Sequence, residues 1–318
     1  GLFSRVNVSL DWYTRTTKDL LMSKQLNSIS GFSSLLTNVG QMRNTGVELE
    51  VRSNNIKTKD FSWITAFNLS HNKNKILKLA DLPWFVDGRY VRKEGYPFNT
   101  IYLREYAGVD PETGSALYYD NQQDENGNYT KNKVTDPGQA SPIPLKDITP
   151  TISGGFMNTF NYKSWELNLN FSYNFGAYVK TTPSYSLTKF DASRNTNRDI
   201  LDRWTPENKN GKFPAILTAA SNPAEYSLLF DQPRIYNSLD IWVKKLNYIR
   251  LQNIRLAYQI PSKLLNRINI NGATVAVEAR NLFVFGSSYK NYLDPESMGN
   301  LYATPIAKSV TFNLSLNF

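Results

Sequence analysis

Residues 165–175 decide the fold class, because their side chains alternate strictly between apolar and polar: Trp-Glu-Leu-Asn-Leu-Asn-Phe-Ser-Tyr-Asn-Phe. Such a period of two is the signature of a β-strand with one apolar and one polar face. Leucine and aromatic residues occupy one face, and asparagine, serine and glutamate occupy the other. In an α-helix the same order would mix both kinds on every side. The segment is therefore predicted to be a strand.

The same alternation recurs from one end of the chain to the other. It is visible in 6–12, 45–52, 61–69, 254–260, 272–285 and 310–318. With the segment that leads into 165, this predicts eight strands, plus further strand pairs if 72–152 holds any, for instance around 98–107. The predicted strands run about nine to eleven residues, the length that spans a bilayer along a tilted path. The polar face suits a wet lumen, and aromatic residues near the strand ends are typical of membrane-interface girdles.

The lengths of the connections sort by side. The short connections, 53–60, 162–164 and 261–271, with a helical turn expected at 262–268, fall on one side. The long ones, 14–42, 72–152, 177–247 and 286–309, fall on the other. Short turns on one side and long loops on the other are typical of outer-membrane barrels. The predicted fold is all-β: an antiparallel transmembrane β-barrel segment with long extracellular loops.

The composition of the 318 residues excludes several classes of protein. There is no cysteine and one histidine, His71, which argues against thiolate metal sites, multi-histidine metal sites and histidine-based catalytic triads. No apolar run is long enough for a transmembrane helix, and no signal peptide precedes the first strand. We therefore expect a piece of a longer chain or a processed product. The net charge of +9 comes without a nucleic-acid-binding motif, so no nucleic-acid partner is expected.

Six motifs in order resemble a known family. They are Gly108-Val109-Asp110-Pro111-Glu112-Thr113-Gly114, Thr149-Pro150-Thr151-Ile152-Ser153-Gly154-Gly155-Phe156, Asp202-Arg203-Trp204-Thr205-Pro206-Glu207-Asn208, the run from Tyr248 to Tyr258, Asn281-Leu282-Phe283, and Asp294-Pro295-Glu296. Together they resemble the C-terminal part of SusC/RagA-type TonB-dependent transporters of the Bacteroidetes outer membrane. The resemblance covers roughly all of 1–318.

The resemblance implies that 1–318 holds about the last eight strands of a 22-stranded barrel. The signal peptide, the Ton box that meets the TonB complex, and the plug domain would lie upstream. Family members import glycan or peptide fragments beneath a SusD-like surface lipoprotein that acts as a lid. The expected partners are therefore that lipoprotein, the TonB complex, outer-membrane lipid and an oligosaccharide or peptide substrate. A transport protein, not an enzyme, is predicted, with no cofactor.

Two groups of residues are candidates for function. Aromatic side chains in the long loops can stack on sugars or anchor a protein lid, although packing inside the loops is an equally simple role. These are Trp84, Phe85, Tyr90, Tyr118, Tyr119, Trp204, Tyr226, Tyr289 and Tyr292. The last strand resembles the β-signal read by the outer-membrane assembly machinery. Its residues are Phe312, Leu314, Leu316 and Phe318.

Charged motifs have simpler interpretations. The stretch from Asp110 to Gly114 has turn chemistry and is predicted to be a structural turn. Asp124, Asn126 and Asn128 have the spacing of a calcium loop, but Gly127 is misplaced and no closing glutamate follows, so no metal site is predicted.

Two further sets of charges line the predicted wall and its rim. Glu48 and Glu50 share the polar face of one strand and are expected to be solvated rather than catalytic. Basic residues near the end of the third strand are expected to contact lipid or solvent, with attraction of an anionic substrate as the alternative. They are Lys73, Lys75, Lys78, Arg89, Arg92 and Lys93.

Two other readings of the strand pattern stay open. Eight strands can close on themselves into a small outer-membrane barrel that serves as an adhesin or anchor. The strands can also build a soluble all-β carbohydrate-binding or hydrolytic domain, whose apolar faces would pack on each other.

Overall fold

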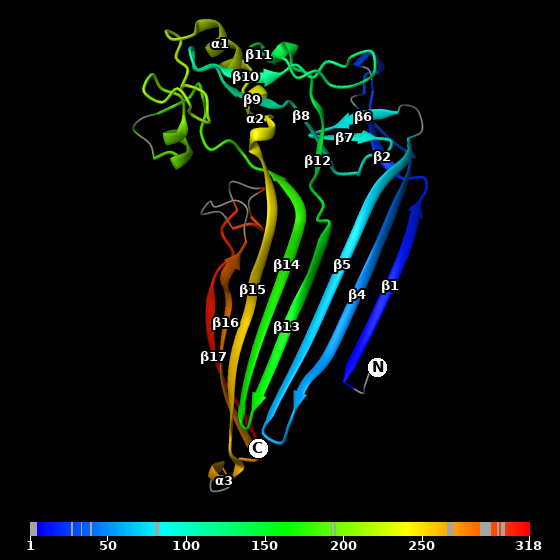
Figure 1. Ribbon diagram of the computed structural model, residues 1–318, viewed down its shortest axis with the longest axis vertical. Helices are drawn as coiled ribbons and strands as arrows, with labels where there is room; N and C mark the ends of the chain where they lie inside the picture. The colour runs from blue at the N-terminus through cyan, green and yellow to red at the C-terminus, as the bar shows by residue number, and fades with distance from the viewer. Residues whose placement is uncertain are drawn as a thin grey trace.

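The computed structural model describes residues 5–26, 28–32, 34–38, 40–79, 83–191, 193, 195–265, 270–286, 294–297, 299 and 303–318. Long antiparallel strands form one eight-stranded sheet in the order β1-β4-β5-β13-β14-β15-β16-β17 (Figure 1). The strands are β1 (Val6–Thr17), β4 (Gly40–Lys57), β5 (Phe61–Leu79), β13 (Ile152–Tyr162), β14 (Trp165–Lys180), β15 (Val243–Ile260), β16 (Gly272–Phe285) and β17 (Ser309–Asn317). The predicted number of long strands and their antiparallel order are confirmed. The two edges, β1 and β17, do not pair with each other, so the sheet is open.

Smaller elements lie at one end of the sheet, which we call the head end; the other is the turn end (Figure 1). One four-stranded sheet has the order β12-β8-β7-β6, with β6 (Trp84–Asp87), β7 (Tyr90–Lys93), β8 (Thr100–Leu103) and β12 (Ile143–Asp147). A three-stranded sheet contains β9 (Tyr106–Val109), β10 (Ala116–Tyr119) and β11 (Lys133–Val134). β2 (Leu21–Gln25) and β3 (Ser34–Asn38) form a hairpin.

The helices are short. They are η1 (Ser28–Ser30), η2 (Pro137–Gln139), η3 (Arg198–Asp202), α1 (Pro223–Asp231), α2 (Arg234–Asn237), η4 (Asp240–Trp242) and α3 (Ser262–Leu265). Among the described residues, no helix has both the length and the apolar character needed to cross a membrane. α3 lies at the turn end and fulfils the first part of the helical turn expected at 262–268; residues 266–269 lie outside the described part (Figure 1).

The register between neighbouring strands places their apolar residues on the same face of the sheet. Phe67 of β5 is opposite Phe156 of β13, which is opposite Phe171 of β14. Nothing in the described chain packs over this face, and its side chains are exposed: Trp12 by 70% and Leu314 by 65%. A soluble sandwich would bury such residues between two sheets. An exposed apolar face of this extent is what a lipid-facing barrel wall requires.

The strands differ in length from the prediction. β1, β13 and β17 have 12, 11 and 9 residues, close to the expected nine to eleven. β4, β5, β14, β15 and β16 have 14 to 19, so the expectation was wrong for them. These strands are longer than a bilayer requires and extend toward the head end. There, polar residues continue the β-ladder and the apolar face stops.

One polar cluster interrupts the apolar face near the turn end. Asn158, 6% exposed, accepts hydrogen bonds at Oδ1 from Trp63 Nε1 and Thr65 Oγ1, both at 2.8 Å. Asn55 Nδ2 donates to Thr65 Oγ1 at 2.6 Å. Polar groups that face an apolar medium must satisfy one another, and this chain of bonds does so across β4, β5 and β13.

The long loops after β5 and β14 fold into a packed unit, which we call the head: residues 83–147 and 181–242 as far as they are described. Its core includes Trp242, 2% exposed, stacked on Phe213 at 5.6 Å and edge-on to Tyr236 at 5.4 Å. The sequence pattern predicted long loops but not this core, because its members come from many short segments with no common period.

Candidate functional site

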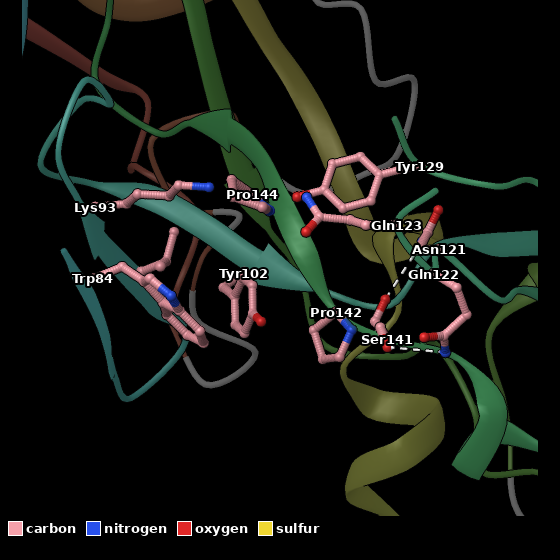
Figure 2. A pocket seen from close by; sticks show the side chains of 11 residues that line it. Trp84, Lys93, Tyr102, Asn121, Gln122, Gln123, Tyr129, Ser141, Pro142 and Pro144 are labelled. Atoms are coloured by element: carbon pink, nitrogen blue, oxygen red, sulfur yellow. Dashed lines mark hydrogen bonds between the residues drawn. The ribbon is translucent and has the colours of Figure 1, made fainter. Parts of the chain in front are cut away.

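The head contains a cavity of about 430 Å³. One side is the four-stranded sheet, which contributes Trp84 of β6, Val91 and Lys93 of β7, Tyr102 of β8 and Pro144 of β12. The other side is the segment after β10, which contributes Asn121, Gln122, Gln123 and Tyr129, and the floor is completed by Ser141 and Pro142 (Figure 2). The size lies within the usual range of small-molecule sites, about 300–1,000 Å³.

Aromatic rings line the sheet side of the cavity. Trp84 and Tyr102 lie side by side with their ring centroids 5.9 Å apart and their planes at 48° (Figure 2). Trp84 is 44% exposed, although it is a large hydrophobic residue. Burial raises the pKa of Tyr102, and the neighbouring Tyr129 acts in the same direction. The Tyr102 hydroxyl therefore keeps its proton at neutral pH and can donate a hydrogen bond.

Amide side chains line the opposite side. Gln122 Nε2 donates to Gln139 O at 3.2 Å and to Ser141 Oγ at 3.4 Å. Gln123 Nε2 donates to Gly127 O at 3.4 Å. Within the described residues no protein group donates to Oε1 of either glutamine, so both oxygens are open to a ligand. The amides are held in place while their acceptors stay free.

Hydrogen bonds to the carboxylates of Asp120 and Asp124 stabilise the segment that contains Gln122 and Gln123. Asp124 Oδ1 accepts hydrogen bonds from the backbone N–H groups of Asn126 at 2.9 Å and Asn128 at 2.8 Å, which lowers the pKa of Asp124. The side chains of Thr130 and Asn132 donate to the Asp120 carboxylate from Oγ1 and Nδ2. The spacing that resembles a calcium loop is therefore used to close a turn. Among the described residues, no three His, Cys, Asp or Glu side chains converge as a metal site would need.

The described aromatic residues among the predicted contact candidates are spread over the head, and of these only Trp84 lines the cavity. Phe85 packs on Ile76 and Leu79 of β5. Tyr118 is 1% exposed inside the head core, so in this conformation its ring serves packing.

The other candidates also have protein neighbours or lie outside the described residues. Tyr90 lies beneath the Arg92 guanidinium at 5.3 Å, and Tyr119 lies beneath Lys131 Nζ at 5.4 Å. Tyr226 stacks on Phe230 with centroids 5.6 Å apart. Tyr289 and Tyr292 lie outside the described residues.

Trp204 joins two of the sequence motifs. Its Nε1 donates to Pro111 O at 3.0 Å, and a Cβ on Gly114 would lie 2.5 Å from its ring. Gly114 has φ +75° and closes the turn by donating its N–H to Asp110 O at 2.8 Å. Asp110 Oδ1 accepts the backbone N–H groups of Glu112 at 2.9 Å and Thr113 at 3.3 Å, and these two bonds lower the pKa of Asp110. The structural turn predicted at Asp110–Gly114 is confirmed.

The structure corrects one residue of the basic group. Arg92 is 5% exposed and bonds to Asp87 Oδ2 at 2.9 Å, and its guanidinium lies 3.9 Å above the Phe98 ring. A buried, paired guanidinium does not contact lipid or solvent, so that expectation was wrong for Arg92. Lys93, the next residue, points to the other side of β7 and lines the cavity.

Of the eleven residues that line the cavity, the sequence pattern singled out only Trp84 and Lys93; among those it missed are Tyr102, Gln122, Gln123 and Tyr129. Tyr102 lies in a short strand whose sequence is like that of many buried strands. Gln122 and Gln123 lie in a polar stretch with the composition of a loop. No local signal separates them from neighbours that point elsewhere.

The residues proposed as the assembly signal lie on or next to β17. Phe312 is 80% exposed, Leu316 39% and Phe318 84%. Their exposure agrees with a lipid-facing edge strand, and their role in assembly stays a prediction.

Several proteins of known sequence or structure are similar to this chain over nearly its whole length. No family model matches the chain. The chain is 29% identical to TonB-dependent receptor P3 of Formosa agariphila over 99% of this chain and 32% of that protein. It is 25% identical to TonB-dependent receptor SusC of Bacteroides thetaiotaomicron over 99% of this chain and 30% of that protein.

The solved structures of a RagAB peptide transporter also match. One match has a TM-score of 0.81 at 28% identity and covers 99% of this chain and 34% of the matching chain. The chain thus spans about a third of the length of the curated relatives it matches.

Proposed function

The chain is related to the SusC/RagA family of TonB-dependent receptors over nearly its whole length, and from this premise we propose that it forms part of an outer-membrane importer. The eight-stranded sheet is a segment of the barrel wall. The head is extracellular and meets the substrate and a SusD-like surface lipoprotein. Energy reaches the receptor from the TonB complex through parts of the protein that 1–318 does not include.

The observation that carries this proposal is the exposed apolar face of the sheet. Trp165, Leu256 and Val275 lie on the inner strands β14, β15 and β16 and are 47%, 42% and 46% exposed. Leu10, Trp12 and Leu314 lie on the edge strands and are each at least 65% exposed. Each such side chain exposed to water forgoes roughly 1.5–3 kcal/mol of burial energy. A sheet with this many exposed apolar side chains is therefore stable in lipid and not in water.

The polar face supports a wet lumen. Arg255 Nη1 bonds to Glu166 Oε1 at 2.7 Å across β14 and β15. Glu278 Oε1 accepts bonds from Asn253 Nδ2 and Arg280 Nε, both at 2.5 Å. Charged groups bonded along one wall, opposite an apolar face, fit a water-filled interior.

The two rival interpretations fit less well. A small self-closed barrel needs the first and last strands to pair, and β1 and β17 are the two free edges of the sheet. A soluble sandwich needs a second layer over the apolar face, and no described element covers it.

The test is to recover the native protein. An antibody against residues of β17 is used to purify the protein from detergent-extracted outer membranes, and the intact polypeptide and its companions are weighed. We expect a polypeptide far larger than 36.3 kDa together with a surface lipoprotein. Uptake by cells should also cease when TonB is deleted. A folded polypeptide of about this size, alone, would contradict the proposal.

A further inference from the structure

We propose that the cavity between β6–β8, β12 and the 121–129 segment is a binding subsite for a sugar residue of an oligosaccharide. This inference rests on the proposed import function and names its substrate class. The lining residues that carry it are Trp84, Tyr102, Gln122, Gln123 and Lys93. The substrate is a neutral or acidic glycan rather than a peptide.

Trp84 offers a surface on which a sugar ring can stack, and Tyr102 adds an aromatic wall beside it. The face of a pyranose that carries axial C–H groups is apolar and packs on the flat face of an indole or phenol ring. Trp84 offers a partly exposed indole to the cavity, and Tyr102 lies beside it with centroids 5.9 Å apart and its plane tilted by 48° (Figure 2). A large aromatic side chain left 44% exposed beside a cavity has apolar area available for a ligand.

The polar groups suit hydroxyls. The free Oε1 atoms of Gln122 and Gln123 accept from sugar O–H groups, while Tyr102 O–H and Lys93 Nζ donate to sugar oxygens. A sugar hydroxyl both donates and accepts, so a wall with acceptors on one side and donors on the other matches it. The hydrogen bonds of 3.2–3.4 Å that Gln122 and Gln123 already make to Gln139, Ser141 and Gly127 restrain these side chains before the ligand arrives.

The charge of the lining limits the ligand further. Lys93 is the one side chain among the lining residues that is charged at neutral pH, and the lining contains no carboxylate. A cationic group would meet an ammonium with no anion to balance it. A neutral sugar or a sugar acid meets no such cost.

The backbone argues against a peptide. Extended peptides bind most simply by adding a strand to a free sheet edge, which requires outward N–H donors. β12 is an edge of its sheet, and Pro144 lies opposite Tyr102 in β8. Tyr102 N donates to Arg89 O, away from β12, so the nitrogen of Pro144 faces the free edge. Pro142, two residues earlier, also lines the cavity. Neither proline has an N–H, so this stretch of the edge lacks two of the donors that a paired peptide strand would need.

The test uses the full-length receptor purified in detergent. Binding of three probes is measured by calorimetry: neutral hexose tetrasaccharides, uronic-acid tetrasaccharides and tetrapeptides. We expect at least one sugar class to bind, and Trp84→Ala to weaken it by about tenfold or more. Gln123→Ala should weaken it by several-fold, and Trp84→Phe, which keeps a stacking ring, should retain most of the affinity.

Phe190→Ala is the matched control. Phe190 is 43% exposed in the head and does not line the cavity, so sugar affinity should change by less than about twofold. Sugar binding that survives Trp84→Ala and Gln123→Ala unchanged would overturn the inference. So would the absence of binding by every sugar probe, or peptide binding that is lost in Trp84→Ala.

A cell-uptake assay separates the two proposals. Uptake that needs TonB, together with cavity variants that bind sugar normally, refutes the subsite and leaves the import function standing. Sugar binding that needs Trp84, in a protein whose cells take up the sugar equally well without TonB, refutes the import function and leaves the subsite standing.

Discussion

Arg250 should hold the segment 294–297 against the wall, and its replacement should release that segment without unfolding the sheet. Arg250 lies in β15 and is 1% exposed. Its Nη2 bonds to Asp294 Oδ1 at 2.5 Å and its Nε to Glu296 Oε1 at 2.8 Å. The Asp294 side chain is 11% exposed and that of Glu296 is 33% exposed. One guanidinium thus pairs with two carboxylates from the connection between β16 and β17.

The expected loss of free energy in Arg250→Met comes from the carboxylates of Asp294 and Glu296, which lose their partner. Removing one partner of a buried ion pair costs about 3–5 kcal/mol, because the remaining charge is desolvated without compensation. Glu296 can turn to solvent, so we take the lower end, about 3 kcal/mol. Since each 1.4 kcal/mol is a factor of ten, the segment should open about a hundredfold more often.

Hydrogen exchange on the full-length receptor measures this opening. The amides to follow are those of Glu296, which donates to Asp294 Oδ1, and Ser297, which donates to Asp294 O, both at 3.0 Å. Their protection should fall by about two orders of magnitude in Arg250→Met, while amides in the β15–β16 ladder should stay within a few-fold of the wild type.

Arg255→Met is the control on the same strand. Arg255 bonds to Glu166 at 2.7 Å, but the two side chains are 32% and 38% exposed, so its loss should cost at most about 1 kcal/mol. Adding Asp294→Asn and Glu296→Gln to Arg250→Met should restore part of the protection, because the unpaired charges are gone. Wild-type exchange at residues 296 and 297 in Arg250→Met would refute the reasoning.

Two other predictions concern a close approach in the wall and a buried acid in the head. A Cβ on Gly154 would lie 2.1 Å from Asn68 O and 2.4 Å from the Tyr173 hydroxyl, so Gly154→Ala should destabilise the barrel by about 1–3 kcal/mol. Gly155→Ala, whose nearest contact is 3.4 Å, should not, and equal heat-induced mobility shifts of the two variants on gels would contradict this. Burial raises the pKa of Glu225, so its contribution to head stability is complete below the unfolded pKa, about 4.3, and is lost as pH rises through the folded value. Exchange protection of α1, corrected for intrinsic rates, should therefore fall from pH 4.5 toward neutral and should flatten in Glu225→Gln; an unchanged slope would show that another group is responsible.

The wall was predictable from local pattern. In a strand each residue's face is set by its own parity, so the alternation of 165–175 alone separated the apolar face from the polar one. Connection length then set which end carries turns and which carries large segments. Turn chemistry at Asp110–Gly114 was equally local, since the aspartate and the glycine act within five residues.

The length of the long strands was not predictable, because nothing in the alternation marks where the bilayer ends and the ladder continues. The buried position of Arg92 was hidden for a related reason. Its burial depends on Asp87 and Phe98, which the turns between β6, β7 and β8 bring to it.

By itself, then, the sequence determined an antiparallel wall with a lipid-facing side, and its motifs indicated the family. Only the tertiary structure decided the head core, the partner of Trp204 and the cavity. Trp84, Tyr102 and Gln123 share no spacing along the chain, and they meet because the pairing of short strands folds three separate segments around one space. Faces of a strand follow from neighbours in sequence, whereas a site made by long-range contacts depends on register and packing that no local period encodes.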